Sequence, residues 1–328
     1  MTNLKTKKWL NSMQKKLFKP RHLKKGSVVV AVAFSDRVTK RDIKDLLKSV
    51  ELLEKWGLKV ILSKHLTDHL EKKSLPSPEM VIAEMLMWAK NDVDAFYCVR
   101  GGFDANRLFH YKKFDHLLKT ISDKRICVLG FSDATTLETP LVYNNLASFY
   151  CPNLIYLHKR SEKTKKSLHR VIFSKKPLRE SIKNLEVIQS FDEKKIKGVL
   201  ITGNLMTMHD CLASDYNPLT KFNEVILMVE EIEESEENVA RFLSTMTAYS
   251  SVKAAIINFR KKTGLDFSRK VIKSMLKRIS ADDIPVFWYK NFGHLPGTQF
   301  FKTLGVGWPV EITVKHGNKG KLEFLPLK

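Results

Sequence analysis

The sequence predicts an α/β protein with an N-terminal doubly wound domain on a parallel sheet, followed by a smaller, strand-rich α/β domain. Three observations support this fold class. Over residues 27–155, apolar β-branched runs alternate with segments of helical hydrophobic spacing, which is typical of βαβ units. After Pro177 most of the apolar segments are short strand candidates. The length of 328 residues fits about two domains.

In the N-terminal domain, residues 27–155, strands and helices are expected to follow one another with short connections. Ser27–Phe34 is a continuous apolar, β-branched run, which is typical of a buried parallel strand. Thr39–Trp56 carries apolar residues at helical spacing and ends at Gly57. The remaining expected elements are strands at Leu58–Leu62, Val93–Val99 and Arg125–Gly130, and helices at Pro76–Lys90 and Asn106–Leu118.

A charge-rich, exposed helical connector is expected over residues 156–184, and the C-terminal domain over residues 185–328. The strand candidates of this second domain are Leu185–Ser190, Lys197–Ile201, Val225–Val229, Ala254–Phe259, Val286–Tyr289 and Val310–Val314, with helical stretches at Leu205–Ala213 and Asn238–Ser250.

The chain carries a net charge of +22, from 57 Lys and Arg against 35 Asp and Glu. Such an excess favours contact with nucleic acid, anionic lipid or acidic small substrates. A Lys-rich surface that only improves solubility explains the same count. Residues 1–26 form a basic N-terminal extension, which is either an amphipathic helix that contacts a membrane surface or docks on a partner, or a mobile basic tail. No apolar run is long enough to predict a membrane-spanning helix.

The four cysteines indicate the compartment. None of them has CxxC spacing, and Cys98 and Cys127 lie inside apolar runs. This pattern predicts buried free thiols in a reducing compartment. The N-terminus also lacks the apolar region and the cleavage site of a secretory signal. A cytoplasmic location is therefore expected.

The most informative motif is the segment from Gly130 to Ala134, where a predicted strand runs into a helix. A strand-to-helix elbow exposes a serine hydroxyl, and small residues two positions before and after it permit the tight turn. The helix N-terminus offers free N–H groups, and that of Asp133 would point at an oxyanion. Ser132 is therefore a candidate nucleophile, and an N-capping serine is the alternative interpretation.

A second motif, Arg100-Gly101-Gly102, follows the strand expected at Val93–Val99. Two glycines allow the backbone to approach a ligand closely. The segment is therefore expected to supply a second oxyanion donor or to cradle a phosphate, unless it is an ordinary turn.

Glu230 ends the apolar run Val225–Val229 and begins a cluster of six glutamates in eight residues. Most of this cluster is expected to face solvent. The first carboxylate can instead point into a cleft and orient a histidine. His294 lies in a loop before Pro296 and Gly297, and it is the candidate general base among the 10 histidines.

No cofactor and no metal ion are expected. The dinucleotide-binding G-x-G-x-x-G and the P-loop motif are both missing from the sequence, which argues against a nucleotide cofactor. His65 and His69 are spaced like metal ligands, but they lie in a charged, Lys-rich loop.

In the order Ser, Glu, His, these segments resemble the serine peptidase family of L,D-carboxypeptidases. That family includes murein tetrapeptide carboxypeptidases and microcin-C immunity peptidases. The resemblance extends over residues 19–328. The similar segments are Lys19–Gly26, Val93–Gly102, Gly130–Asp133, Gly198–Leu205, Ile226–Glu230, Gly293–His294 and Leu304–Val306.

The resemblance implies a role for each candidate residue. Ser132 would be the nucleophile, and His294 the general base and then the acid. Glu230 would orient His294. The backbone N–H groups of Gly102 and Asp133 would form the oxyanion hole. The resemblance also implies a site in the cleft between the two domains, and a homodimer.

Three segments near the expected cleft depart from the family's pattern. Tyr150-Cys151-Pro152 replaces a His/Tyr-Gly-Pro turn, residues 32–35 replace an Ala-Pro pair, and residues 103–105 replace small residues after Arg-Gly-Gly. The triad positions are intact, so an active enzyme is expected, and the departures bear on its substrate preference.

The sequence therefore predicts a cytoplasmic serine carboxypeptidase that acts in peptidoglycan recycling. Its substrate would be a short muropeptide, cut between an L-configured centre and a terminal D-residue. The alternatives are a peptidase of the same family that cleaves a peptidyl-nucleotide antibiotic, a catalytically dead relative, and a basic protein that binds nucleic acid or a membrane surface. Only the charge supports the last alternative, because no nucleic-acid-binding motif is present.

Overall fold

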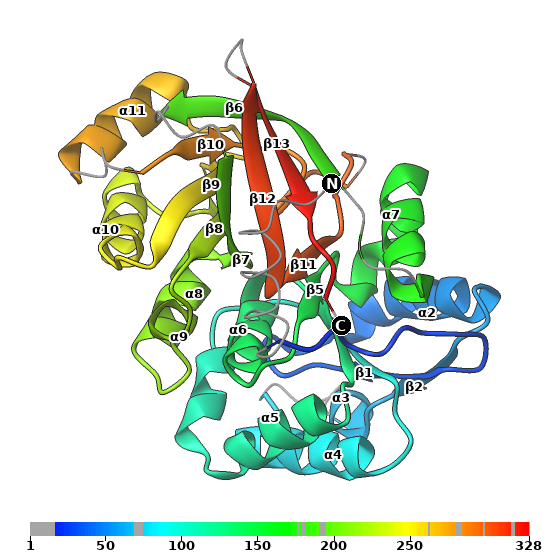
Figure 1. Ribbon diagram of the computed structural model, residues 1–328. Helices are drawn as coiled ribbons and strands as arrows, with labels where there is room; N and C mark the ends of the chain where they lie inside the picture. The colour runs from blue at the N-terminus through cyan, green and yellow to red at the C-terminus, as the bar shows by residue number, and fades with distance from the viewer. Residues whose placement is uncertain are drawn as a thin grey trace.

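The computed structural model describes residues 17–68, 75–175, 178, 181–189, 195–261, 263–279, 284–297, 299–315 and 319–327. Over these ranges the chain forms an open sheet and a closed barrel (Figure 1). The basic extension is described only from Leu17 onward, so most of the expected amphipathic helix lies outside the described residues. The part of the extension that is described lies against the first sheet, where Phe18 pairs with Leu146 in a single parallel bridge.

The first sheet has five parallel strands and one antiparallel edge strand. Its strands are β1 (Val28–Val32), β2 (Lys59–Leu62), β3 (Ala95–Cys98), β4 (Cys127–Gly130), β5 (Ser148–Tyr150) and β11 (Leu304–Val306). Their order is β11-β5-β4-β3-β1-β2, and only the β11–β5 pair is antiparallel. The strand order reverses between β1 and β3. In open α/β sheets, ligands bind beyond the carboxyl ends of the strands at such a point.

Helices cover both faces of this sheet, as a doubly wound fold requires. Val29 and Ala31 belong to the core cluster that contains α2 (Lys40–Lys55), whereas Val30 and Val32 belong to the cluster that contains α4 (Pro78–Lys90) and α5 (Lys113–Asp123). Successive residues of a strand point to opposite faces, which explains the continuous apolar run. The other helices of this half are α3 (Lys64–Asp68), η1 (Ala105–His110), η2 (Ser132–Ala134), α6 (Thr135–Tyr143), η3 (Leu154–Lys159) and α7 (Glu162–Phe173).

Helix α7 forms where the charge-rich connector was expected. Ser161 caps its N-terminus by accepting a hydrogen bond from the backbone of Thr164. The expectation of an exposed connector is wrong for one face of the helix, because Leu168, Val171 and Ile172 are buried. These three side chains recur at helical spacing and join the main core.

The second half of the chain is built on a closed, mixed barrel of seven strands. The strands are β6 (Ser181–Gln189), β7 (Lys195–Asn204), β8 (Val225–Ile232), β9 (Val252–Arg260), β10 (Val286–Trp288), β12 (Trp308–Lys315) and β13 (Lys319–Phe324). Their order around the barrel is β10-β6-β13-β12-β7-β8-β9, with parallel pairing from β7 to β10 through β8 and β9. The helices of this half are α8 (Leu205–Leu212), α9 (Pro218–Lys221), α10 (Glu236–Thr247) and α11 (Arg269–Arg278).

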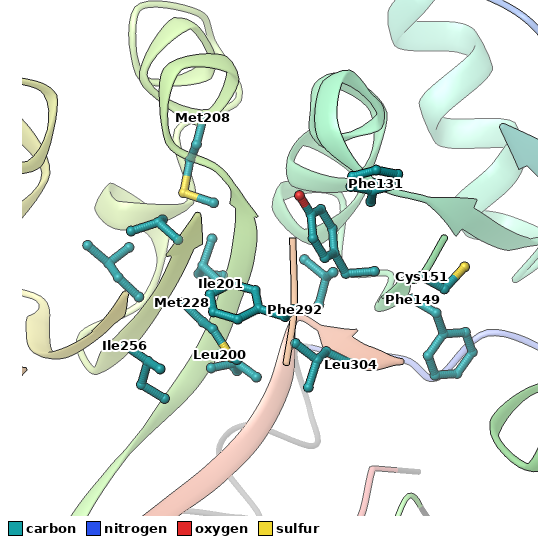
Figure 2. Close-up of a cluster of buried hydrophobic side chains, with 14 of the residues drawn as sticks. Phe131, Phe149, Cys151, Leu200, Ile201, Met208, Met228, Ile256, Phe292 and Leu304 are labelled. Atoms are coloured by element: carbon teal, nitrogen blue, oxygen red, sulfur yellow. The ribbon is translucent and has the colours of Figure 1, made fainter. Parts of the chain in front are cut away.

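The chain joins the two sheets after β10. From there it leaves the barrel, runs through the loop that carries His294, and adds β11 to the first sheet beside β5, so that Leu304 pairs with Tyr150. One core cluster accordingly spans both halves. Figure 2 shows Phe292 and Leu304 between side chains of the barrel, such as Leu200, and side chains of the first sheet, such as Phe149.

The predicted state of the cysteines is confirmed, because all four are buried and free. Within the part of the chain that the structure describes, every helix is too short or too polar to span a bilayer.

Candidate active site

Ser132 lies at the carboxyl end of β4, on the turn into η2. Its φ of +63° falls in the left-handed region, which residues other than glycine seldom adopt. Gly130 makes the turn possible, because a Cβ atom there would lie only 2.7 Å from the Cβ of Ala134 and 2.9 Å from Sγ of Cys98. The N-cap position belongs to Phe131 and not to Ser132. This strained backbone favours the elbow over the N-capping alternative, because such strain is characteristic of functional sites.

Two neighbouring side chains hold the strained elbow in place. The amide of Asn153 makes two hydrogen bonds with Phe131, accepting from its N–H at 3.0 Å and donating to its carbonyl at 3.3 Å. The hydroxyl of Tyr150 accepts a hydrogen bond of 3.1 Å from the N–H of Ser132. Neither Asn153 nor Tyr150 was a predicted site residue, although Tyr150 lies in a segment that departs from the family's pattern.

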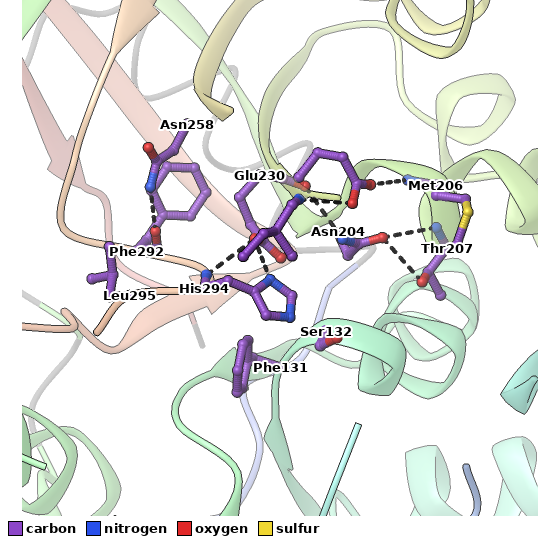
Figure 3. A network of polar contacts seen from close by, with 12 residues as sticks. Phe131, Ser132, Asn204, Met206, Thr207, Glu230, Asn258, Phe292, His294 and Leu295 are labelled. Carbon is purple, nitrogen blue, oxygen red and sulfur yellow. Dashed lines mark hydrogen bonds and ion pairs between the residues drawn. The ribbon is translucent and has the colours of Figure 1, made fainter. Parts of the chain in front are cut away.

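Glu230 and His294 form a hydrogen-bonded pair next to this elbow. Glu230 lies near the carboxyl end of β8, and its side chain is 1% exposed. Its Oε2 accepts hydrogen bonds from Nδ1 of His294 at 2.7 Å and from the backbone N–H of the same residue at 3.2 Å. Figure 3 shows the imidazole ring between Glu230 and Ser132, with its outer edge facing Ser132.

The approach of the loop to Glu230 requires a glycine before His294. Gly293 has a φ of +84°, and a Cβ atom there would lie 2.6 Å from Oε2 of Glu230. On the other side, the ring of Phe131 packs against the imidazole with 5.0 Å between the ring centroids. The Gly-His pair seen in the sequence thus allows close contact with the buried carboxylate.

Charge interactions oppose the effect of burial in this pair. Burial alone would raise the pKa of Glu230, but the charge of His294 and the hydrogen bonds from His294 and Tyr150 outweigh it, so the pKa is lowered. Burial alone would lower the pKa of His294, but the carboxylate of Glu230 outweighs it, so the pKa is raised. The pair therefore favours an ionised glutamate and strengthens the imidazole as a proton acceptor.

Glu231 corrects one expectation about the glutamate cluster. It was expected to face solvent with most of the cluster, but it is 4% exposed. Its carboxylate accepts hydrogen bonds from the N–H groups of Met206 at 3.1 Å and Ile232 at 2.8 Å. Burial, and after it the charge of Glu230, raises its pKa to about 7. The apolar Ile232 is the signal that strand β8 continues past Val229.

The side chain of Asp133 connects three segments around the elbow. It accepts hydrogen bonds from the hydroxyl of Ser35, from the N–H of Ala105 at 2.9 Å and from the hydroxyl of Thr207 at 3.4 Å. Its carboxylate is thereby occupied. The backbone N–H lies in the first turn of η2, where N–H groups have no partner within the helix.

Gly101 and Gly102 bring the turn after β3 close to the serine. A Cβ atom on Gly101 would lie 3.0 Å from Oγ of Ser132, and one on Gly102 would overlap the hydroxyl of Ser35. The predicted close approach of backbone is therefore present. The side chain of Arg100 forms ion pairs with two carboxylates, at 2.9 Å with Asp42 and at 3.7 Å with Asp36.

Ser132 and His294 open into a cleft of about 550 Å³, within the range of roughly 300–1,000 Å³ that is usual for small-molecule sites. The first half of the chain contributes Asp36, Arg100, Gly101, Gly102, Phe103, Asn153, Tyr156 and Arg160 to its walls, and the barrel half contributes Asn204, Met206, Thr207, Glu231, Glu233 and Glu234. The cleft therefore lies between the two sheets, as the resemblance implied.

His65, the described member of the two histidines with metal-ligand spacing, makes hydrogen bonds within the protein. Nδ1 of His65 contacts Glu84 at 2.7 Å, and Nε2 accepts a hydrogen bond from the N–H of Ala33 at 3.1 Å. His69 lies outside the described residues. Across the described ranges, no group of three or more His, Cys, Asp or Glu side chains is arranged to hold a metal ion.

Comparison with known proteins places the chain in a family. The model of the LD-carboxypeptidase N-terminal domain matches residues 29–151, and that of the C-terminal domain matches residues 197–312. A curated protein of Synechocystis sp., named "Putative carboxypeptidase slr1534", is 26% identical over 243 residues, which is 73% of this chain and 74% of that protein.

Solved structures share the fold over almost the whole chain. An MccF-like protein from Bacillus anthracis superposes with a TM-score of 0.78 at 18% identity, over 94% of this chain and 99% of that one. A muramoyltetrapeptide carboxypeptidase from Oxalobacter formigenes superposes with a TM-score of 0.72 at 23% identity, over 91% and 100%. With both halves matched in order by the models of one family, the chain belongs to the peptidase S66 family of serine LD-carboxypeptidases.

Proposed function

We propose that this protein removes a terminal D-amino acid from a short muropeptide, with Ser132, His294 and Glu230 as its catalytic triad. One observation carries the proposal. Glu230 holds Nδ1 of His294 at 2.7 Å, and the opposite edge of the ring faces Ser132 (Figure 3). An ionised carboxylate can only accept, so Nδ1 donates and Nε2 keeps a free lone pair.

In the first half of the reaction, Nε2 of His294 takes the hydroxyl proton as Oγ of Ser132 attacks the scissile carbonyl. The carbonyl oxygen becomes an oxyanion, which the N–H groups of Gly102 and Asp133 stabilise by hydrogen bonds. Glu230 stays ionised and stabilises the imidazolium. The intermediate then collapses, His294 passes its proton to the leaving nitrogen, and the terminal residue departs as a free amino acid.

In the second half, water attacks the acyl group on Ser132. His294 takes a proton from this water and returns it to Oγ when the ester bond breaks. The products are the shortened peptide with a new carboxylate and the free enzyme. No redox step or metal ion takes part in this scheme, because the buried glutamate and the polarised histidine supply the base.

A peptidyl-nucleotide is the second candidate substrate, and exposed aromatic side chains at the cleft favour it. Phe103 is 73% exposed and Tyr156 is 40% exposed, and both line the cleft. Aromatic faces of this kind stack on flat rings such as nucleobases. A solved MccF structure of the same fold holds glutamyl sulfamoyl guanosine, with a TM-score of 0.75 at 19% identity over 95% of this chain and 100% of that one. The triad would act in the same way on this substrate.

Incubation of the pure protein with a panel of three substrates tests the proposal. The panel contains a muropeptide tetrapeptide, the corresponding pentapeptide and an aminoacyl sulfamoyl nucleoside, and mass spectrometry identifies the products. We expect D-alanine from the tetrapeptide and little from the pentapeptide, because inversion at one centre displaces the carbonyl, and a displacement of about 1 Å can cost on the order of 10²-fold in rate. Cleavage of the nucleoside conjugate alone would favour the second candidate.

We also infer a cytoplasmic location, a role in peptidoglycan recycling and a homodimer. The buried free thiols support a reducing compartment. The homodimer is inferred because members of the family commonly form one. Sedimentation of the pure protein measures the oligomeric state directly.

A further inference from the structure

Arg160 lines the cleft and carries a charge that no acidic side chain among the described residues balances. It follows η3 on the side of the first sheet and lines the same cleft as Ser132. Its Nη1 donates a hydrogen bond of 2.9 Å to the carbonyl of Leu295, and its Nε is buried without a hydrogen-bond partner among the described residues. Burial lowers its pKa, yet a guanidinium remains charged in proteins.

The other arginine of the cleft is in a different situation. Arg100 contacts Asp42 at 2.9 Å and Asp36 at 3.7 Å, so two carboxylates balance its charge. Over the described ranges, Arg160 has no ion pair with an acidic side chain. A partly buried charge is unfavourable unless it is paired. This difference indicates that the anion for Arg160 arrives with the ligand.

Arg160 also lies where a carboxypeptidase needs a carboxylate receptor. The carboxylate of the terminal residue is one residue beyond the scissile carbonyl, and consecutive Cα atoms are about 3.8 Å apart. The receptor must therefore lie beside the nucleophile and the base. Arg160 meets this condition, because it is hydrogen-bonded to Leu295, the residue directly after His294.

We propose that Arg160 binds the terminal carboxylate of the peptide and thereby restricts the enzyme to substrates with a free C-terminus. This inference rests on the proposed function, because it takes Ser132 as the attacking group. Nη1 keeps one N–H for Leu295, and its second N–H together with Nη2 forms the paired hydrogen bonds that a carboxylate prefers. The same guanidinium then contacts both the substrate and the loop of His294.

The test compares the tetrapeptide with its C-terminal carboxamide, in which a neutral amide replaces the terminal carboxylate. We expect Arg160→Gln to lower kcat/KM for the free acid by about 10- to 100-fold, the range for losing a hydrogen bond to a charged group, and to lower the slower carboxamide reaction much less, because the amide carries no charge for Arg160 to pair with. Arg160→Lys should restore part of the preference. Arg269→Gln is the matched control, because Arg269 is 35% exposed and paired with Glu186 outside the cleft.

An equal loss on both substrates would overturn the inference, since it would mean that Arg160 only positions the His294 loop. Binding of both peptides to the Ser132→Ala variant, measured by calorimetry, gives a readout that needs no turnover. A preference for the free acid that disappears with Arg160→Gln supports the inference, and equal affinity for both peptides overturns it. Failure of the wild-type enzyme to cleave any peptide would contradict the proposed function, while the binding result still decides the role of Arg160. Thermal denaturation verifies that each variant is folded.

Discussion

The hydroxyl of Tyr150 donates a hydrogen bond of 2.7 Å to Oε1 of Glu230. The hydroxyl oxygen of Tyr150 in turn accepts a hydrogen bond of 3.1 Å from the N–H of Ser132. Tyr150 ends β5 of the first sheet and Glu230 lies in the barrel, so one buried phenol connects the Ser132 elbow to the carboxylate that is hydrogen-bonded to His294. Burial, and after it the charge of Glu230, raises the pKa of Tyr150 well above its ordinary value, so the phenol keeps the proton that it donates.

Tyr150→Phe should therefore reduce kcat more than it changes KM. The substitution leaves Oε1 of Glu230 and the N–H of Ser132 without this partner, and we expect a loss of about 10- to 100-fold, as for other hydrogen bonds to a charged group. Steady-state kinetics measures the effect. Tyr143→Phe, at the end of α6 and away from the cleft, is the control and should retain full activity. Unchanged kcat in Tyr150→Phe would show that the connection is only structural.

The activity should rise with pH as His294 loses its proton. Burial lowers the pKa of His294, but Glu230 raises it more, and the net shift is upward from 6.5. Since the general base must be neutral, kcat/KM should increase with an apparent pKa above 6.5. Glu230→Gln removes the opposing charge, so it should shift this pKa downward and also reduce kcat. A pH–rate profile of both enzymes checks this. An unshifted profile would mean that Glu230 does not set the pKa of the general base.

Glu138 should make the protein less stable as the pH rises. Its side chain is fully buried on α6, and neither carboxyl oxygen has a hydrogen-bond partner among the described residues. Burial raises its pKa well above 4.5. The folded state then binds more protons than the unfolded state, so this stabilising contribution is complete below the unfolded pKa and is lost as the pH rises toward the folded one.

Glu138→Gln removes this dependence, because glutamine does not ionise. The unfolding free energy of the variant relative to the wild type should therefore increase from pH 5 to pH 8. Urea denaturation at the two pH values measures the difference. A constant difference would mean that Glu138 ionises in the folded protein as readily as in the unfolded chain.

The net charge should steer acidic peptides to the cleft. Attraction between separated charges is screened over about 8–10 Å near physiological ionic strength, so we expect kcat/KM to fall as salt is added while kcat stays constant. If kcat/KM does not change with salt, the net charge of +22 does not steer the substrate. Salt-sensitive binding to random DNA without hydrolysis would favour the nucleic-acid alternative.

Most of the strands and helices could be predicted, because each depends on local hydrophobic spacing, but β5, α11 and β13 were not among the expected elements. The alternation over residues 27–155 gave the parallel sheet, and Gly130 together with Ala134 marked the elbow. Pairing between distant segments could not be predicted in the same way. Strand β11 has only three residues, and its pairing with β5 depends on how the chain returns from the barrel. Closure of the barrel likewise depends on non-local pairs such as β10 with β6.

The same distinction applies to the candidate site. Ser132, Glu230 and His294 each lie in a local pattern that sequence analysis can detect. The contributions of Tyr150 and Glu231 depend on burial and on contacts between the two halves of the chain. In the sequence, Tyr150 is distinguished only by its place in a segment that departs from the family's pattern. Glu231 belongs to a run of acidic residues of the kind that usually faces solvent, so its burial could not be predicted.

Covalent labelling of Ser132 is the sharpest test of the proposed triad. A fluorophosphonate probe reacts with an activated serine, and peptide mass spectrometry locates the modified residue. We predict a single adduct on Ser132 that is absent from Ser132→Ala, together with a loss of kcat of roughly 10⁴-fold or more in that variant, as for other triads. A wild-type protein that cleaves peptide without labelling at Ser132, or normal turnover by Ser132→Ala, would contradict the account.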